Sequence, residues 1–192
     1  MEKEESFYDK VYKTGGSSRM YKKHYTQSIY LPIWKKALEL IQNVKQPDII
    51  DIGCGVGQFA NMLFHNGLYN YKGIDFSKEA IRLAREQNSD QMDKFEVDNA
   101  YSSKIYHQNY NIVILFEVLE HLQEDIDVLE KIRSGATIFF SVPNFNSESH
   151  VRWFTSEEDI KNRYGNYVQI DKIYPFRIGR ENKIYLCHGT KK

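Results

Sequence analysis

Asp51-Ile-Gly-Cys-Gly-Val-Gly57 is the stretch of sequence that decides the fold, and two isoleucines, Ile49 and Ile50, lead into it. An acidic residue at the end of a short apolar run is followed by three glycines at alternate positions and by a helix-like segment at 58–64. This order predicts a strand, a tight turn and a helix start, because glycine accepts positive φ and lets the backbone approach a ligand closely. The acid at the strand end suits a ligand with a cationic amino group and ribose hydroxyls, whereas it would repel a pyrophosphate.

Strand-like and helix-like segments alternate through the rest of the chain. Apolar runs predict further strands at 71–76, 94–97, 111–116, 137–142, 167–174 and 183–188. Amphipathic segments predict helices at 33–44, 78–87, 124–132 and 156–164. The alternation predicts an α/β fold with an open, doubly wound, mostly parallel sheet and helices on both faces. We expect residues 1–30 to form an accessory segment and residues 31–192 to form one domain.

Composition limits the classes of partner and compartment. The chain has 192 residues, with 26 acidic and 26 basic ones, so its formal net charge is zero and gives no reason to expect a polyanion. Its two cysteines, Cys54 and Cys187, form no Cys-x-x-Cys pair, and the first residues are polar. No apolar run approaches the roughly 20 residues of a membrane span. We therefore expect reduced thiols, no signal peptide, no membrane span and a cytoplasmic location.

Acidic residues also end the strands that follow the glycine turn. Asp75 ends the second predicted strand about 20 residues beyond the glycines, where a carboxylate can accept hydrogen bonds from both ribose hydroxyls. Asp98, Asn99 and Ala100 follow the third strand, and the acid and amide could read an adenine edge. A single acid at a strand end commonly caps a helix or faces water. Several of them in register with Asp51 favour a ligand, because the carboxyl ends of parallel strands meet at one edge of the sheet.

Four segments resemble, in order and spacing, those of the class I S-adenosylmethionine-dependent methyltransferases. They are the glycine turn at 51–57, Gly73-Ile-Asp-Phe-Ser77, Phe95-Glu-Val-Asp98 and Phe116-Glu-Val-Leu-Glu-His-Leu122. The resemblance covers 47–144 and implies a seven-stranded sheet in the order 3-2-1-4-5-7-6 with strand 7 antiparallel. It also implies a site for S-adenosylmethionine made by Asp51, Gly53, Cys54, Gly55, Gly57, Asp75, Phe76, Asp98, Asn99, Ala100 and Phe116. A nicotinamide dehydrogenase fits less well, because its fingerprint is Gly-x-Gly-x-x-Gly.

A second group of residues follows the fourth predicted strand. If the chain turns into a helix there, Glu117, Glu120 and His121 share one face, and His150 lies on a loop over the same crevice. Two carboxylates and two imidazoles are plausible ligands for a divalent cation such as Mg²⁺. The set resembles the metal site of the small-RNA 2′-O-methyltransferases and of the polyprenyl-dihydroxybenzoate type of O-methyltransferase. The same segment is common in metal-free relatives, where His121, His150 and Glu117 would be candidate catalytic residues instead.

The resemblance implies an enzyme that moves a methyl group from S-adenosylmethionine to a small molecule. The histidines and acids favour a hydroxyl oxygen of a sugar, a lipid-linked or an aromatic metabolite. One alternative is a metal-dependent RNA 2′-O-methyltransferase, against which the zero net charge argues. Another is a non-catalytic S-adenosylmethionine-binding accessory protein. The aromatic segment from Phe7 to Tyr30 is expected either to close over the site as a lid or to pack on the sheet edge.

Overall fold

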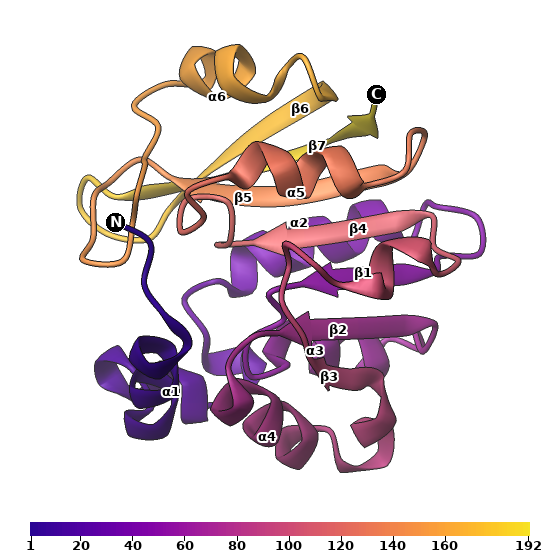
Figure 1. The fold of residues 1–192 in the computed structure, drawn as a ribbon, viewed down its shortest axis with the longest axis vertical. Helices are drawn as coiled ribbons and strands as arrows, with labels where there is room; N and C mark the ends of the chain where they lie inside the picture. The colour runs from indigo at the N-terminus through magenta and orange to yellow at the C-terminus, as the bar shows by residue number, and fades with distance from the viewer.

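A seven-stranded sheet forms the centre of the molecule (Figure 1). This computed structural model describes the backbone of residues 1–192 and the side chains of residues 1–16 and 18–192. The strands are β1 (Ile49–Ile52), β2 (Tyr71–Asp75), β3 (Phe95–Val97), β4 (Ile112–Phe116), β5 (Thr137–Pro143), β6 (Val168–Arg177) and β7 (Lys183–Lys191). Their order is β3-β2-β1-β4-β5-β7-β6, and β7 runs antiparallel to both of its neighbours. The predicted fold class and strand order are confirmed.

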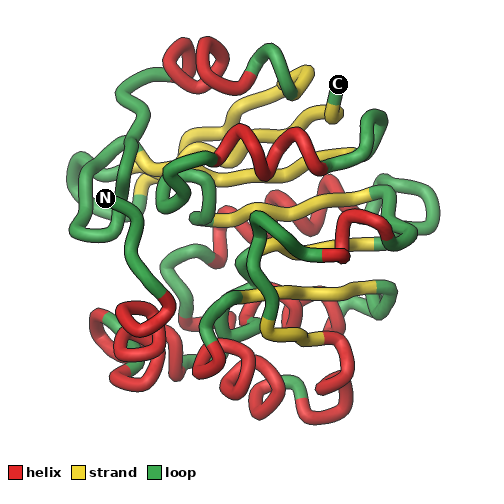
Figure 2. Tube along the Cα trace, in the orientation of Figure 1, coloured by secondary structure: helices red, strands yellow, loops and turns green.

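Helices cover both faces of this sheet (Figure 2). They are α2 (Leu31–Ile41), α3 (Gln58–His65), α4 (Lys78–Gln87), α5 (Asp125–Lys131) and α6 (Glu157–Tyr164). Strand β4 needs a layer of helices on each face of the sheet, because its side chains point alternately into two hydrophobic cores. Ile112 and Ile114 pack with α2, α3 and α4, whereas Val113 and Leu115 pack with α5 and α6. A strand buried on both faces reads as the continuous apolar run that the sequence shows.

Helices α4 and α6 begin at capping side chains. The Ser77 hydroxyl accepts a hydrogen bond from the amide of Ala80 and begins α4. At α6, Ser156 and Asp159 form a reciprocal capping box. Such caps satisfy backbone amides that have no partner within the helix. Ser77 and Ser156 are thus the N-caps of α4 and α6.

The chain does not turn into a helix directly after β4, so the condition for a shared helical face of Glu117, Glu120 and His121 is not met. Residues 117–124 form successive turns, and α5 begins only at Asp125. Glu117 adopts a φ of 55°, a left-handed conformation, so it cannot itself belong to a right-handed helix. In addition, the amide of Gln123 donates to the carboxylate of Glu2 and is not available to a carbonyl four residues earlier.

The N-terminal segment crosses the carboxyl ends of the central strands. Helix α1 (Glu5–Thr14) packs beside α4, and the indigo chain in Figure 1 lies on the side to which the arrowheads of β1, β2 and β4 point. The Asp9 carboxylate accepts hydrogen bonds from the Ser77 hydroxyl at 2.5 Å and from the Glu79 amide at 3.2 Å. Helix α1 is therefore fixed to the first turn of α4. None of the helices described is long and apolar enough to cross a lipid bilayer.

Candidate functional site

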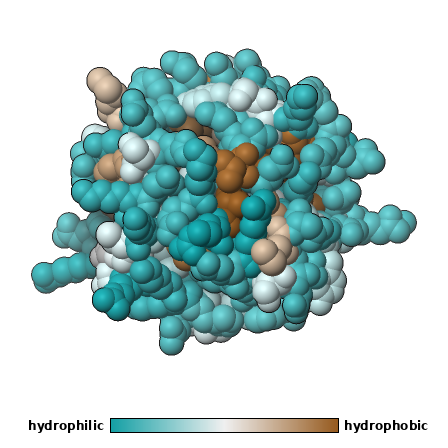
Figure 3. Space-filling view, turned by 60° about the horizontal axis from the view of Figure 1, so that its bottom comes forward, coloured by the Kyte–Doolittle hydropathy of each residue, from teal (hydrophilic) through white to brown (hydrophobic). Residues whose placement is uncertain are grey.

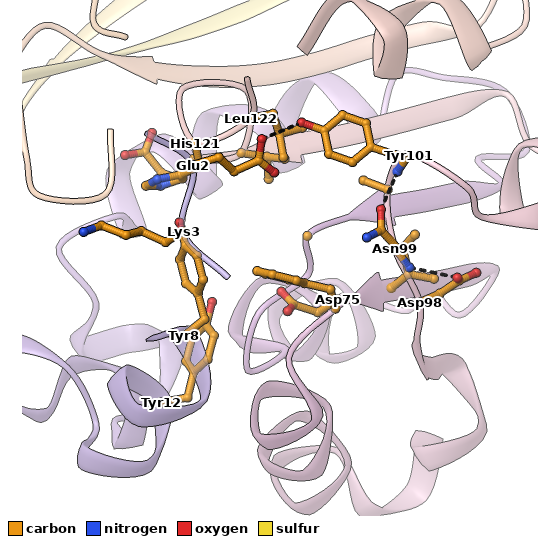
Figure 4. A pocket seen from close by; sticks show the side chains of 16 residues that line it. Glu2, Lys3, Tyr8, Tyr12, Asp75, Asp98, Asn99, Tyr101, His121 and Leu122 are labelled. Carbon is orange, nitrogen blue, oxygen red and sulfur yellow. Dashed lines mark hydrogen bonds between the residues drawn. The ribbon is translucent and has the colours of Figure 1, made fainter. Parts of the chain in front are cut away.

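Two adjoining cavities open at the carboxyl ends of β1, β2, β3 and β4. The first has a volume of about 90 Å³, and the second has a volume of about 350 Å³. Both are lined by Tyr8, Tyr12, Gly53, Glu117 and His121, which therefore mark the junction between them. Apolar side chains, in brown, gather near the centre of one otherwise hydrophilic face of the molecule (Figure 3). Figure 4 shows the first cavity with α1 on one side and the loop after β3 on the other.

The glycine turn after β1 brings the backbone to the cavity wall. Gly53 has a φ of 74°, and a Cβ atom there would lie 2.5 Å from Cγ2 of Val118. Gly55 has a φ of 55°, and the nearest atom to a Cβ placed there would be the Tyr12 hydroxyl at 3.5 Å. Both positions require glycine, the first through contact with the segment after β4 and both through positive φ. Gly57 lines neither cavity in this structure and forms the N-cap of α3 instead.

Two buried carboxyl groups flank this turn. Asp51, at the second cavity, accepts a hydrogen bond from the Tyr71 hydroxyl at 2.8 Å. Asp75, at the first cavity, accepts hydrogen bonds from the amides of Gly55 at 3.0 Å and Ser77 at 2.9 Å. Burial raises the pKa of Asp51 to about 7 and the pKa of Asp75 to about 6. Among the described side chains neither carboxylate has a basic partner, so a ligand with a cationic group or hydroxyl donors would be stabilised here.

The loop after β3 forms the opposite wall of the first cavity. Asp98 accepts hydrogen bonds from the Ser103 hydroxyl at 2.5 Å and from the Asn99 amide at 2.8 Å. The Asn99 side chain accepts from the amide of Tyr101 at 2.8 Å. These bonds fix the side chains of Asp98 and Asn99 beside Ala100. Phe76 adds an apolar side chain to the lining of the same cavity. The predicted residues Cys54 and Phe116 lie in the second cavity.

Three of the four predicted metal ligands converge. One ligand atom each of Glu120, His121 and His150 lies within 4.8 Å of the others. Nδ1 of His121 donates to the carbonyl of Ser149, and Nδ1 of His150 donates to the carbonyl of Phe145, both at 2.9 Å. A carbonyl can only accept, so in each neutral ring the proton lies on Nδ1 and the Nε2 lone pair is free.

The carboxylate of Glu120 is the group in this cluster that most needs a ligand. It is completely buried, and neither of its oxygens has a hydrogen-bond partner among the described side chains. Nε2 of His121 lies 3.7 Å from Oε1 of Glu120, beyond hydrogen-bonding distance. Burial raises the pKa of Glu120 well above its usual range and lowers the pKa of His121 to about 4. An orphaned carboxylate beside two free imidazole nitrogens fits a divalent cation.

Glu117 lies apart from this cluster. Its carboxylate accepts a hydrogen bond from the Ser141 hydroxyl at 2.7 Å, and its amide donates to the same hydroxyl at 2.8 Å. Burial raises the pKa of Glu117 to about 7. The segment is a set of turns, so Glu117 does not share a helical face with Glu120, and it lies at the junction of the cavities instead.

The accessory segment contributes residues that the sequence did not single out. The Tyr8 hydroxyl is buried, and Ser149 lies beside it without hydrogen-bonding geometry. The Tyr8 ring contacts Phe76 and His121 edge-on, with ring centroids 5.2 and 5.8 Å apart. Glu2 accepts hydrogen bonds from the Tyr101 hydroxyl at 2.8 Å (Figure 4) and from the Gln123 amide at 2.6 Å. In the sequence, only the density of aromatic residues at 7–30 indicated that the N-terminal segment lies at the site.

Comparisons with known proteins agree on one family. A family model described as a methyltransferase domain matches residues 23–174. The ubiquinone biosynthesis O-methyltransferase of Hydrogenovibrio crunogenus is 25% identical over 171 residues, which cover 83% of this chain and 70% of that protein. Its counterpart from Nitrosomonas europaea is 27% identical over 120 residues, covering 59% of this chain and 51% of that protein. The matched segments thus span 51% to 70% of the length of these relatives.

Solved structures share the fold at low sequence identity. The magnesium protoporphyrin IX methyltransferase of Synechocystis, with bound S-adenosylmethionine, is 16% identical with a TM-score of 0.66, and covers 85% of this chain and 80% of its own. A putative methyltransferase of Haloferax volcanii, in complex with the Trm112 activator, is 16% identical with a TM-score of 0.75, and covers 96% of this chain and 97% of its own.

Proposed function

This chain belongs to the methyltransferase-domain family of class I, S-adenosylmethionine-dependent enzymes, and from that premise we propose that it methylates a hydroxyl oxygen of a small aromatic molecule. S-adenosylmethionine supplies a sulfonium-activated methyl group when it is bound. The residues around the first cavity fit this donor. Asp75, held by two backbone amides, would accept hydrogen bonds from ribose hydroxyls, and the edge formed by Asp98 and Asn99 would face the base. Asp51 would attract the donor's cationic amino group.

The observation that carries the proposal is the cluster of Glu120, His121 and His150 beside the junction of the cavities. These three residues would hold a divalent cation such as Mg²⁺, which would supply Lewis acidity and lower the pKa of a bound hydroxyl. A hydroxyl nucleophile needs this kind of activation or a base, whereas a neutral amine needs less. Glu117 is placed to accept the proton, because it lines both cavities and its pKa of about 7 suits proton transfer near neutrality.

The walls of the second cavity support an aromatic acceptor. Its ring-bearing residues are Phe7, Tyr8, Tyr12, Tyr21, Tyr30, Trp34, Phe59, Phe116, His121, Phe145 and His150. A flat ring with neighbouring oxygens would pack on these side chains and present its oxygens to the cluster. An aromatic cavity in a chain of zero net charge is a poor match to the phosphates of RNA. The relatives named ubiquinone biosynthesis O-methyltransferases give further support.

Transfer of isotopically labelled methyl groups to a small probe tests this proposal. The full chain with Mg²⁺ should methylate 3,4-dihydroxybenzoate, should ignore 4-hydroxybenzoate, and should lose activity in EDTA. Calorimetry with S-adenosylhomocysteine should show affinity reduced about tenfold or more by Asp75→Ala, since a buried carboxylate with two amide donors is lost. Asp171→Ala, at an exposed position of β6, is the matched control. Catechol methylation that persists in EDTA, or methylation of RNA in its place, would overturn the proposed acceptor chemistry.

A further inference from the structure

We propose that Arg152 is a positioning residue that holds the irregular segment at 117–123 against the loop carrying His150, so that Glu120, His121 and His150 converge. This inference rests on the proposed function, because it concerns the cation site of that function. Arg152 lines neither cavity, and only 14% of its side-chain surface is exposed. It acts through the backbone that carries the ligands.

The guanidinium donates hydrogen bonds to backbone carbonyls that would accept from backbone amides if this segment were a helix. Its Nη1 atom donates to the carbonyls of Leu119, at 2.5 Å, and Leu122, and its Nη2 atom donates to the carbonyl of Gln123 at 2.9 Å. These three carbonyls enclose Glu120 and His121 in sequence. A single side chain therefore fixes the backbone on both sides of two candidate ligands.

The backbone of the Arg152 loop bonds to the same segment. The carbonyl of Glu120 accepts hydrogen bonds from the amides of Val151 at 2.8 Å and Arg152 at 3.4 Å. In the opposite direction, the ring of His121 donates to the carbonyl of Ser149. His150 lies between these contacts, with its ring centroid 5.0 Å from that of His121. Hydrogen bonds of Ser149, Val151 and Arg152, the residues that flank His150, thus join its loop to the segment that carries Glu120 and His121.

Asp125 anchors the guanidinium and supplies a natural control. It is completely buried, and its carboxylate lies 3.1 Å from Nη1 of Arg152. The same carboxylate receives two hydrogen bonds from Arg163, at 2.8 and 2.5 Å, and one from the Tyr164 hydroxyl at 2.8 Å. Within the described chain the side-chain hydrogen bonds of Arg163 go to Asp125 alone. Arg152 and Arg163 therefore share an anchor, but only Arg152 reaches the ligand segment.

Lysine cannot reproduce this arrangement. A guanidinium spreads five donors over a planar fork, which can serve three carbonyls and a carboxylate together, whereas an ammonium carries its three donors on one atom. Outer contacts of this kind orient metal ligands, and their loss typically weakens metal affinity by about 10- to 100-fold. Arg152→Lys should keep a positive charge beside Asp125 but lose the simultaneous hydrogen bonds to the carbonyls of Leu119, Leu122 and Gln123.

Titration of the full chain with Co²⁺, followed by visible absorption and calorimetry, tests the inference. The wild-type protein and Arg163→Lys should bind Co²⁺ with similar affinity and the same absorption spectrum. Arg152→Lys should bind about tenfold or more weakly and with an altered spectrum, while its thermal stability stays comparable to that of Arg163→Lys. Arg152→Gln, expected to show the same weakening, replaces the lysine variant if that variant does not fold.

The outcomes separate the two proposals. If the wild-type protein binds no Co²⁺ and Glu120→Gln changes nothing, the cation site of the proposed function is wrong, and the role of Arg152 falls with it. If the wild-type protein binds Co²⁺ and Arg152→Lys matches Arg163→Lys in affinity and spectrum, only the Arg152 inference is overturned.

Discussion

Asp51 is a single residue whose burial links the stability of the fold to pH. Its carboxyl group is buried at the second cavity with the Tyr71 hydroxyl as its hydrogen-bond donor. Burial raises the pKa of Asp51 from its usual value near 4 to about 7. The folded protein therefore favours the protonated carboxyl, so its contribution to stability is present at low pH and is lost as pH rises through about 7.

We predict that Asp51→Asn changes the pH dependence of stability in the ligand-free protein. Asparagine stays neutral, so the stability of the variant relative to the wild-type protein should rise by about 3 kcal/mol between pH 5 and pH 8.5, at about 1.4 kcal/mol for each pH unit up to the folded pKa of about 7. Denaturant unfolding across this pH range measures the difference. Tyr71→Phe removes the donor that stabilises the charged form, so it should move the transition to higher pH. A difference between Asp51→Asn and wild type that is the same at both pH values would contradict the assignment.

Residue roles were predictable where the backbone dictates them. Asp51 and Asp75 lie in the last residues of parallel strands and Asp98 directly follows one, so their place at the carboxyl edge follows from topology alone. The contacts of Tyr8 and Arg152 depend on tertiary distances that no local pattern encodes. The place of Glu117 relative to Glu120 and His121 was not predictable, because the positive φ of Glu117 is not visible in a sequence that otherwise suits a helix.

Helix α1 is held in place by side-chain contacts with distant parts of the chain. Asp9 ties it to α4, Glu2 ties the preceding tail to Tyr101 and Gln123, and the helix places Tyr8 and Tyr12 at the junction of the cavities. The sequence predicted a segment over the site or on the sheet edge. Its attachment is a carboxylate that caps a different helix, which sequence spacing does not reveal.

We predict that Asp9→Ala weakens the binding of S-adenosylhomocysteine by roughly tenfold, equivalent to about 1.4 kcal/mol. The variant removes the acceptor for the Ser77 hydroxyl and the Glu79 amide, so α1 loses its fixed position over the first cavity. Calorimetry provides the affinity. Asp9→Asn keeps a carbonyl acceptor and should recover most of the binding, and Lys10→Ala, at an exposed position on the same helix, is the control. Equal affinities for Asp9→Ala and Lys10→Ala would show that α1 does not hold the donor.

The whole molecule behaves as one unit because each central strand contributes to both cores. Alternate residues of β4 belong to the two clusters on opposite faces of the sheet, and β1 and β5 do the same. Loss of either helical layer would expose the strands that support the other layer. We therefore expect one cooperative transition, with near- and far-ultraviolet circular dichroism changing together.

A ligand that binds between the N-terminal segment and the strand ends should move this transition as a whole. S-adenosylhomocysteine at 100 times its dissociation constant stabilises the folded state by about 2.7 kcal/mol. For a domain of this length, each kcal/mol raises Tm by about 2–4 °C, so we predict an increase of about 5–10 °C. Asp75→Ala should lose most of the increase at the same ligand concentration, and Asp171→Ala should keep it. The shift should appear equally in both spectral regions, because the ligand contacts strand ends shared by the two cores. A shift confined to one region would mean that the N-terminal segment and the sheet unfold separately, contrary to the single unit proposed for the fold.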